Sequence, residues 1–521
     1  MNSILKRFPL YPLLFSVYPA LALLAANIDQ IKVSTAIRAL LVSFCGVVAL
    51  LLLLQVLVRN WPRTALIAFW LMFLFFSYGH IYNFLKQHPV GVNLGHHTLL
   101  FPLWLVLWVS GIYLLLKKVR NPAAVIPVLN LITFFLLIFP VARIILFNVR
   151  ISNLLSEARR APAPVDGFHL PETRQAPDIY YIILDAYSRD DDLLKYYQFD
   201  NTPFINSLEA MGFYVARCSQ SNYAQTELSV SSSLNYNYLD ALGDHFTAGS
   251  SDRSALWPLI KHSAIRQVLE SFGYTAINFK NNYSWLAWED ADYYFVSPDD
   301  NDTNAVLNQG SMNSFEIMFL RSTAGIAALD IAQKLKLPKK LLLDTKNPEK
   351  TNYKRVLYTL KKLKYNDVPA MPGPKFIYVH LISPHPPYVF NVNGDFEFRS
   401  EDDNQGYSTQ ITYINQRVEE IVKGILDHAA VPPVIIIQGD HGINGKDPQR
   451  RTKIFNAYYL PGDGKKWLYP SISPVNTFRV VLNSYFGGSL ELLPDKSLYS
   501  TYKYPYKYQV IPDQRVDCGG Q

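Results

Sequence analysis

The stretch Val434-Ile-Ile-Ile-Gln-Gly-Asp440-His441-Gly442 decides how the carboxyl-terminal part of this chain folds. Its run of apolar, mostly β-branched residues is typical of a buried parallel strand, and it ends abruptly in two residue types that bind metals. In open α/β sheets, ligands bind outside the carboxyl ends of the strands. A carboxylate beside an imidazole can hold a divalent cation there. The pair alone is equally compatible with a hydrogen-bonded turn, so the assignment depends on further ligands.

Three more apolar runs alternate with segments of helical pattern. The runs are Ile179–Leu184, Tyr274–Phe279 and Phe376–Leu381, and the helical segments are Pro203–Met211, Ala255–Ser271 and Thr409–His428. Strands that alternate with helices indicate an α/β domain with a mostly parallel sheet.

Residues suited to metal binding and catalysis follow these runs. Asp185 ends the first run, Thr226 lies in the loop after Gly212–Ala216, and His380 and His385 come at the end of the third. Carboxylates and imidazoles at several strand ends, together with Asp440-His441, predict a metal site at one edge of the sheet.

The amino-terminal part is strongly apolar, and five of its stretches are long enough to cross a bilayer. These stretches are roughly Phe8–Ala26, Ala39–Val58, Thr64–Tyr82, Thr98–Leu116 and Ala123–Ala142. We therefore predict a helical membrane domain over residues 1–147, a connector over 148–176 and a catalytic domain over 177–521. The first stretch also resembles a signal peptide that is cleaved near Ala26, which would leave four spans.

The placement of Lys and Arg predicts the orientation, because basic loops stay on the cytoplasmic side. Lys6 and Arg7 precede the first span, and basic residues recur at 59–63 and 117–120, whereas the alternate loops carry few. We expect a multi-pass protein of the inner or plasma membrane with a cytoplasmic amino terminus and an extracytoplasmic catalytic domain. The net charge of +7 is spread along the chain without a basic block or nucleic-acid motif, so we expect no nucleic-acid partner.

The order of these residues resembles the sulfatase-like branch of the alkaline phosphatase superfamily over about residues 177–460. The resemblance includes Asn201-Thr202-Pro203 at the start of a helix, Thr226-Glu-Leu-Ser-Val and Asp440-His441-Gly442. With five spans ahead of it, the chain is similar to lipoteichoic acid synthases and lipid A phosphoethanolamine transferases. The resemblance implies that Asp185, Thr226, Asp440 and His441 bind the metal, with Thr226 also the nucleophile. It further implies that His385, and less strongly His380, contact the phosphoryl group.

The residues themselves make this chemistry reasonable. A threonine hydroxyl is a poor nucleophile near neutral pH and needs a base or a coordinated metal. A divalent ion such as Zn²⁺ or Mn²⁺ would lower the pKa of the Thr226 hydroxyl and neutralise charge on the phosphoryl group. His385 or His380 would protonate the leaving alkoxide.

Three departures limit the resemblance. The loop around Ser221 lacks the Cys/Ser-x-Pro-x-Arg motif of true sulfatases. A histidine that the transferases carry after Asp-His-Gly is missing, and Lys446 or Arg451 is the candidate replacement. Asn415 stands where hydrolases of the branch often have Asp, and its simplest interpretation is a surface residue.

We therefore expect a membrane-anchored, metal-dependent phosphotransferase. It would move phosphoethanolamine or phosphoglycerol from a phospholipid donor to an envelope glycan or lipid acceptor through a phospho-Thr226 intermediate. The alternatives are a membrane-tethered phosphodiesterase or sulfatase-type hydrolase, and a catalytically inactive envelope-assembly protein.

Overall fold

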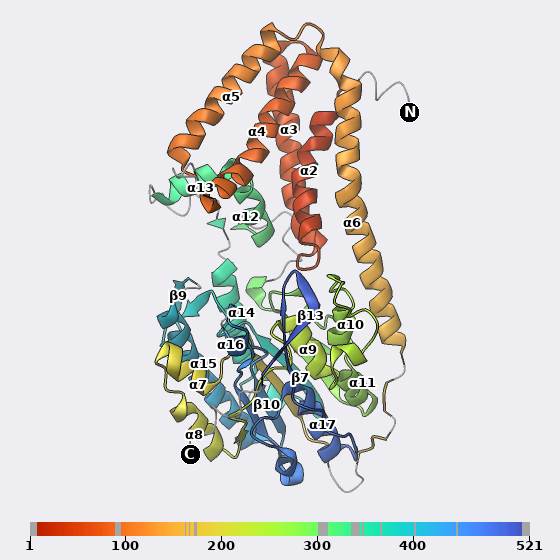
Figure 1. The fold of residues 1–521 in the computed structure, drawn as a ribbon, viewed down its shortest axis with the longest axis vertical. Helices are drawn as coiled ribbons and strands as arrows, with labels where there is room; N and C mark the ends of the chain where they lie inside the picture. Colours follow the sequence, from red (N-terminus) through yellow and green to blue (C-terminus); the bar gives the residue numbers. More distant parts are fainter. Residues whose placement is uncertain are drawn as a thin grey trace. The chain divides into compact units, whose positions relative to one another are not determined.

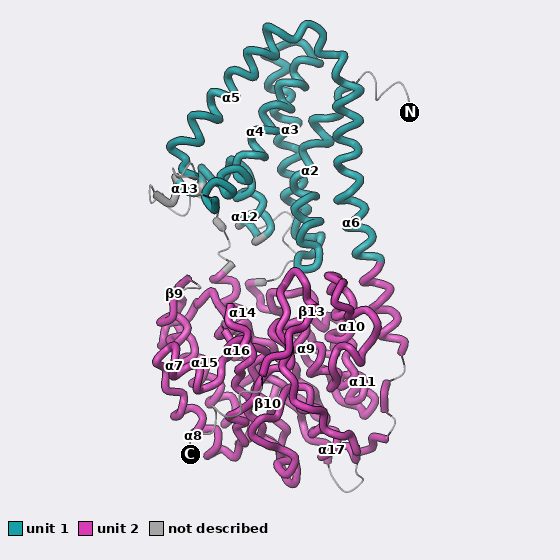
Figure 2. Tube along the Cα trace, viewed as in Figure 1, with its two compact units in different colours: residues 1–149, 302–348 teal, residues 150–301, 349–521 magenta. Residues whose placement is uncertain are grey.

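A computed structural model describes residues 8–88, 95–161, 163–165, 167–170, 175–300, 311–334, 344–345, 348–364, 367–400, 403–443 and 446–512. The chain divides into two compact units (Figure 2). Unit 1 comprises residues 1–149 and 302–348, and unit 2 comprises residues 150–301 and 349–521.

Unit 1 is built from long apolar helices (Figure 1). They are α2 (Tyr11–Ala26), α3 (Ile37–Val58), α4 (Trp61–Gln87), α5 (His97–Lys117) and α6 (Ile126–Arg160). Within the described residues, α3 to α6 are the four helices long and apolar enough to cross a membrane. Helix α2 has 16 residues, and at 1.5 Å per residue it is about 24 Å long, less than the roughly 30 Å of a hydrocarbon core. Four of the five predicted spans therefore have the length of a span.

Helix α6 is longer than the sequence pattern indicates. It continues without interruption for 35 residues to Arg160, so the first part of the expected connector is helical. Its last turns belong to unit 2, where Arg150 pairs with Asp252 and Arg159 Nη2 lies 2.9 Å from Asp290 Oδ2. These ion pairs fasten the end of the helix to the domain that follows it.

Residues 302–348 group with unit 1, although they lie in the middle of the predicted catalytic domain. Their described parts include α12 (Ser314–Arg321), α13 (Gly325–Lys334), β5 (Ser311–Met312) and β6 (Asp344–Thr345). The Ala324 amide donates to the Phe75 carbonyl of α4 at 2.8 Å. A Cβ atom on Gly79 would collide with the Ser322 backbone, so glycine permits this close approach. The boundaries 1–147, 148–176 and 177–521 remain a prediction, and the compact units differ from them here and within α6.

Unit 2 contains the expected α/β domain. Its seven described strands pair in the order β2-β11-β10-β1-β7-β3-β4. The central three are β10 (Val434–Gln438), β1 (Ile179–Leu184) and β7 (Lys375–Leu381), and all their residues are buried. The outer four are β2 (Tyr214–Val215), β11 (Asn456–Tyr459), β3 (Thr275–Phe279) and β4 (Tyr293–Phe295). Strands β10, β1, β7, β3 and β4 run parallel, whereas β11 and β2 pair antiparallel. The prediction of a mostly parallel sheet is confirmed.

Helices and a carboxyl-terminal hairpin complete unit 2. The helices are α7 (Asp190–Tyr197), α8 (Thr202–Ala210), α9 (Thr226–Leu234), α10 (Leu256–Lys261), α11 (Ala264–Ser271), α14 (Pro348–Lys362), α15 (Asn404–His428), α16 (Pro448–Thr452) and α17 (Pro474–Tyr485). The hairpin joins β12 (Ser497–Thr501) to β13 (Tyr504–Ile511). The single helix predicted over Ala255–Ser271 is wrong, because Ser263 adopts an extended conformation and separates α10 from α11.

Candidate metal centre

Asp185, Asp440 and His441 meet at the carboxyl edge of the central strands. In the register of the sheet, Ile183 of β1 lies opposite Gln438 of β10. The segments that follow the two strands therefore leave the sheet side by side. One ligand atom from each of the three residues lies within 4.8 Å of the others, and all three are buried. The sheet therefore brings together residues that are about 250 positions apart in the sequence.

Tight turns hold the two aspartates next to each other. Ala186 has a φ of 60°, which turns its amide toward β10, and that amide donates to Asp440 Oδ1 at 3.0 Å. Glycines flank the Asp-His pair because neighbouring backbone is close: a Cβ on Gly439 would lie 2.5 Å from the Tyr187 carbonyl oxygen. A Cβ on Gly442 would collide with another carbonyl in the same way.

The ring of His441 is oriented for metal binding. Its Nδ1 lies 3.0 Å from the carbonyl oxygen of Gly442 and donates to it, which leaves the lone pair on Nε2. Nε2 lies 3.4 Å from Asp440 Oδ2 and 3.7 Å from Asp185 Oδ1. Burial, and then the nearby charge of Arg451, lower the pKa of His441 to about 4, so the ring is neutral at ordinary pH.

Thr226 faces the same nitrogen from the start of α9. Its Oγ lies 3.0 Å from His441 Nε2. Ser229, one turn later, donates its hydroxyl to the Asp440 carbonyl oxygen at 2.8 Å and ties α9 to the strand end. The amino terminus of a helix stabilises negative charge, as on a phosphoryl group. The structure thus places Thr226 beside the three residues with which the sequence groups it.

The donor set fits a divalent cation. Asp185 Oδ1 and Asp440 Oδ2 are buried without a hydrogen-bond partner among the described residues. Leaving charged oxygens unpaired in this way is costly unless a cation neutralises them. Two carboxylates, an imidazole and a hydroxyl suit Zn²⁺ or Mn²⁺.

His380, near the end of β7, and His385, which follows the strand, occupy different positions. The side chain of His380 is fully buried, with Nε2 3.3 Å from Asp185 Oδ2. His385 is half-buried, and its ring centroid lies 6.3 Å from that of His441. Burial raises the pKa of Asp185, but His385 and His380 outweigh it and hold that pKa below its ordinary value. His380 therefore contacts a candidate ligand, whereas His385 lies closer to solvent.

Arg451 places a cationic side chain against one of the candidate ligands. Its Nη2 donates to His441 Nε2 at 3.0 Å, and its Nε donates to the Ala224 carbonyl oxygen at 2.9 Å. Lys446, the other candidate replacement for the missing histidine, is exposed. Both residues were candidates from the sequence. The sequence does not show which of them contacts His441, because that depends on the tertiary structure.

A buried ion pair brackets the threonine. Arg253 Nη1 lies 2.5 Å from Glu227 Oε2, and Arg253 Nη2 donates to Gln225 Oε1 at 2.5 Å. The ring of Tyr502, at the tip of the β12–β13 hairpin, lies 4.2 Å from the guanidinium carbon. One guanidinium thus holds the residues on both sides of Thr226. Sequence reasoning missed Arg253, because nothing in its local pattern connects it to a segment 26 residues away.

Asn415 is buried rather than on the surface, so the simplest interpretation of that position is wrong. It accepts a hydrogen bond from the Tyr187 hydroxyl at 2.7 Å and donates to Asn201 Oδ1 at 2.9 Å. The turn that carries Asp185 and Ala186 leads directly into Tyr187. Asn415 therefore supports the loop after β1 through the Tyr187 hydroxyl.

Comparisons with known proteins give structural matches alone: no family model matches the sequence, and no curated protein is similar to it. The periplasmic domain of EptC from Escherichia coli, solved with Zn, is 11% identical with a TM-score of 0.43, covering 68% of this chain and 97% of that chain. The lipooligosaccharide phosphoethanolamine transferase EptA from Neisseria meningitidis is 13% identical with a TM-score of 0.36, covering 92% and 96%. The lipoteichoic acid synthase LtaP from Listeria monocytogenes is 11% identical with a TM-score of 0.34, covering 62% and 77%. Both enzyme groups that the sequence resembles are among the matches. Because these identities and TM-scores are low, we base the functional proposal on the site geometry.

Proposed function

We propose that this protein is a membrane-anchored, metal-dependent phosphotransferase that acts on a phospholipid. The observation that carries the proposal is the position of Thr226 Oγ, 3.0 Å from His441 Nε2, beside two buried carboxylate oxygens that lack hydrogen-bond partners. A hydroxyl in that position is suited to nucleophilic attack. The apolar helices of unit 1 support a lipid substrate, because a soluble ester would not require them.

Asp185, Asp440, His441 and Thr226 would hold the divalent ion, Zn²⁺ or Mn²⁺. When bound, the ion supplies positive charge that acidifies the Thr226 hydroxyl and offsets the charge of the phosphoryl oxygens. His380 is buried against Asp185, so we assign it the role of orienting that carboxylate. We assign phosphoryl contact and proton transfer to His385, which lies closer to solvent.

Two displacements account for the reaction. In the first, Thr226 Oγ, whose proton has passed to solvent, attacks the phosphorus as the alkoxide, the phosphorus–oxygen bond to diacylglycerol breaks, and His385 donates a proton to the leaving alkoxide. In the second, the hydroxyl of an envelope glycan or lipid gives its proton to His385 and attacks the phosphorus of phospho-Thr226, and the threonine oxygen leaves. Arg451 stabilises the equatorial phosphoryl oxygens in both steps.

We also propose that unit 2 lies on the extracytoplasmic side and the amino terminus in the cytoplasm. Lys and Arg in alternate loops of the sequence support this orientation. Phosphoethanolamine and phosphoglycerol are the two groups proposed for transfer.

The test uses the full chain in detergent with Mn²⁺ or Zn²⁺ and a phospholipid labelled in its headgroup. Mass spectrometry should detect the headgroup phosphate on Thr226 and an equal amount of released diacylglycerol. The variant Thr226→Val keeps the shape of the side chain without the hydroxyl and should give neither product, whereas Thr226→Ser should retain the adduct. Adduct on another residue, or diacylglycerol release by Thr226→Val, would refute the nucleophile. Free headgroup in place of a labelled acceptor would favour the hydrolase.

A further inference from the structure

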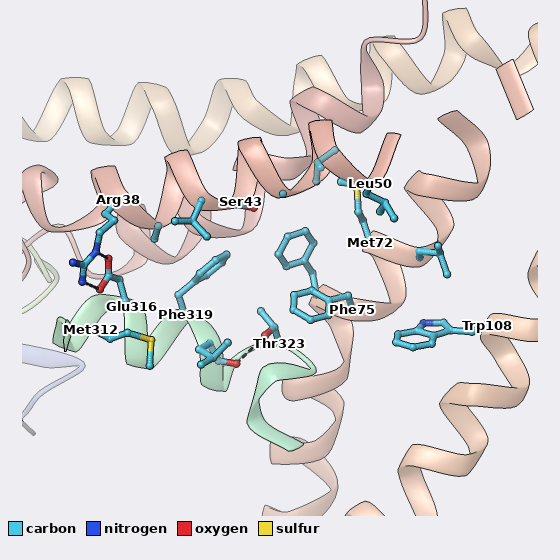
Figure 3. Close-up of a pocket in the computed structure, with 17 residues that line it drawn as sticks. Arg38, Ser43, Leu50, Met72, Phe75, Trp108, Met312, Glu316, Phe319 and Thr323 are labelled. Atoms are coloured by element: carbon cyan, nitrogen blue, oxygen red, sulfur yellow. Dashed lines mark hydrogen bonds and ion pairs between the residues drawn. The ribbon is translucent and has the colours of Figure 1, made fainter. Parts of the chain in front are cut away.

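A large apolar cavity in unit 1 is lined by none of the residues of the candidate metal centre (Figure 3). Its volume is about 710 Å³, within the range of roughly 300–1,000 Å³ typical of small-molecule sites. Val42, Gly46 and Val47 of α3 line one wall, and Phe75 of α4 and Phe319 of α12 line others. Such a cavity offers almost no partner to a water molecule, so it suits a hydrocarbon.

Hydrogen bonds hold α12 and its flanking residues against the other helices of unit 1. Asn313, the N-cap of α12, donates its side-chain amide to the Thr35 carbonyl oxygen at 2.9 Å. The Ala324 amide and the close approach at Gly79 hold the other end of the segment against α4. The cavity is therefore lined by elements that are hydrogen-bonded to one another within a single compact unit.

One end of the cavity is charged. Arg38, in the first turn of α3, forms a bidentate ion pair with Glu316 of α12, and Figure 3 shows this pair at the end opposite Trp108. The Arg38 side chain is 25% exposed and that of Glu316 is 8% exposed. The first turn of a membrane helix lies at the level of lipid headgroups. A ligand in this cavity would thus have hydrocarbon in the apolar part and a polar group beside the ion pair.

The charges of the pair favour one type of headgroup. An anionic headgroup beside Arg38 would also face the Glu316 carboxylate and be repelled by it. A zwitterionic headgroup can place its phosphate toward Arg38 and its ammonium toward Glu316, so that both contacts are favourable.

We propose that this cavity binds one acyl chain of a zwitterionic glycerophospholipid, with the headgroup beside Arg38 and Glu316. The proposal does not depend on whether that lipid is the phosphoryl donor. It is a binding site of unit 1 and holds even if unit 2 hydrolyses its substrate or has none.

Gly46 provides a clean test, because a Cβ atom there would meet no other atom within 4 Å. In the variant Gly46→Trp, the backbone has room for the added Cβ, and the indole is placed at a position that lines the cavity. Leu53→Trp is the matched control: it places the same ring on the same helix at a side chain that is 63% exposed and does not line the cavity. All variants are made in the Thr226→Val background, so that turnover does not consume lipid.

The full chain is equilibrated with vesicles of equimolar phosphatidylethanolamine and phosphatidylglycerol with identical acyl chains, then extracted and washed in detergent. Mass spectrometry measures the lipid retained per protein. We expect preferential retention of phosphatidylethanolamine, an approximately tenfold weaker retention in Gly46→Trp, and no change in Leu53→Trp. Tenfold corresponds to the loss of about two buried methylene groups of the chain.

A second variant tests the headgroup contact. The double exchange Arg38→Glu with Glu316→Arg keeps the ion pair, and thermal unfolding would show that α12 remains attached, but it reverses the two charges. We expect the preference for phosphatidylethanolamine to weaken. Equal retention of both lipids by the unmodified chain, or an unchanged preference in the double exchange, would overturn the headgroup assignment. Undiminished retention by Gly46→Trp would overturn the cavity as the lipid site.

Discussion

Replacing Arg253 by Met tests whether the buried ion pair holds the nucleophile in place. The guanidinium is 5% exposed and its partner Glu227 is 9% exposed, so the pair is largely shielded from solvent. Removing one partner from a buried ion pair costs about 3–5 kcal/mol, because the other charge stays buried. In Arg253→Met the carboxylate of Glu227 and the amide oxygen of Gln225 both lose this donor.

This loss of stability should appear locally, at the start of α9. A loss of about 3–5 kcal/mol corresponds to a rise of about two to nearly four orders of magnitude in the equilibrium population of the locally open state. Hydrogen exchange of peptides that cover residues 224–234, measured by mass spectrometry on the full chain in detergent, reports this opening. Turnover should also fall by about a hundredfold, because a nucleophile displaced by about 1 Å loses that much.

Two variants make the result interpretable. Arg217→Met breaks an ion pair of the same chemistry with Glu209, but both side chains are 39% exposed, so it should cost at most about 1 kcal/mol. The double variant Arg253→Met with Glu227→Leu removes the carboxylate together with the guanidinium and should recover most of the protection of α9. If Arg253→Met and Arg217→Met change exchange in α9 equally, the pair does not hold the nucleophile.

Three further predictions follow from other contacts. Arg451→Gln removes a charge beside His441 and should lower kcat by about 10²–10³-fold with little change in KM. This is the pattern expected for a donor that acts in the transition state. A rise in KM as large as the fall in kcat would contradict that role. Burial lowers the pKa of His262 from 6.5 to about 4, so between these values the unfolded chain binds a proton that the folded chain does not. Stability should therefore fall as pH drops from 6.5 to 4, and the thermal midpoint of His262→Gln should depend less on pH; identical profiles would exclude the residue. Asn415→Leu removes the nearer of the two acceptors of the Tyr187 hydroxyl and leaves Asn201 Oδ1 at 3.2 Å. It should destabilise the protein by about 0.5–1.5 kcal/mol, whereas Asn415→Asp, which keeps the nearer acceptor, should retain more of the stability; denaturant unfolding measures both.

The sequence was most informative where chemistry follows from local pattern. The apolar runs before Asp185, His380 and Asp440 predicted three strands, and the structure confirms them as adjacent members of one sheet. Parallel strands end at a common edge, so ligand-type residues at three strand ends were expected to meet. The same reasoning does not show which way a side chain turns. It grouped the buried His380 with the more exposed His385 and placed Asn415 on the surface.

Tertiary contacts also decided how the chain is partitioned. Residues 302–348 have no long apolar run, so a hydropathy pattern assigns them to the soluble part. Yet α12 forms an ion pair with α3, and the residues just after α12 contact α4 through a hydrogen bond and a close approach at Gly79. Such contacts join residues that are more than 200 positions apart, and no local periodicity records them.

The sequence by itself determined the apolar membrane helices, the α/β sheet and the residue types of the candidate metal site, because hydropathy and strand-end chemistry are local properties of the chain. The tertiary structure alone decided that Arg451 rather than Lys446 reaches His441, that Arg253 brackets Thr226, and that an apolar cavity forms between α3, α4 and α12. These features depend on which distant surfaces pack together. That packing follows from the burial of the whole chain rather than from any single segment.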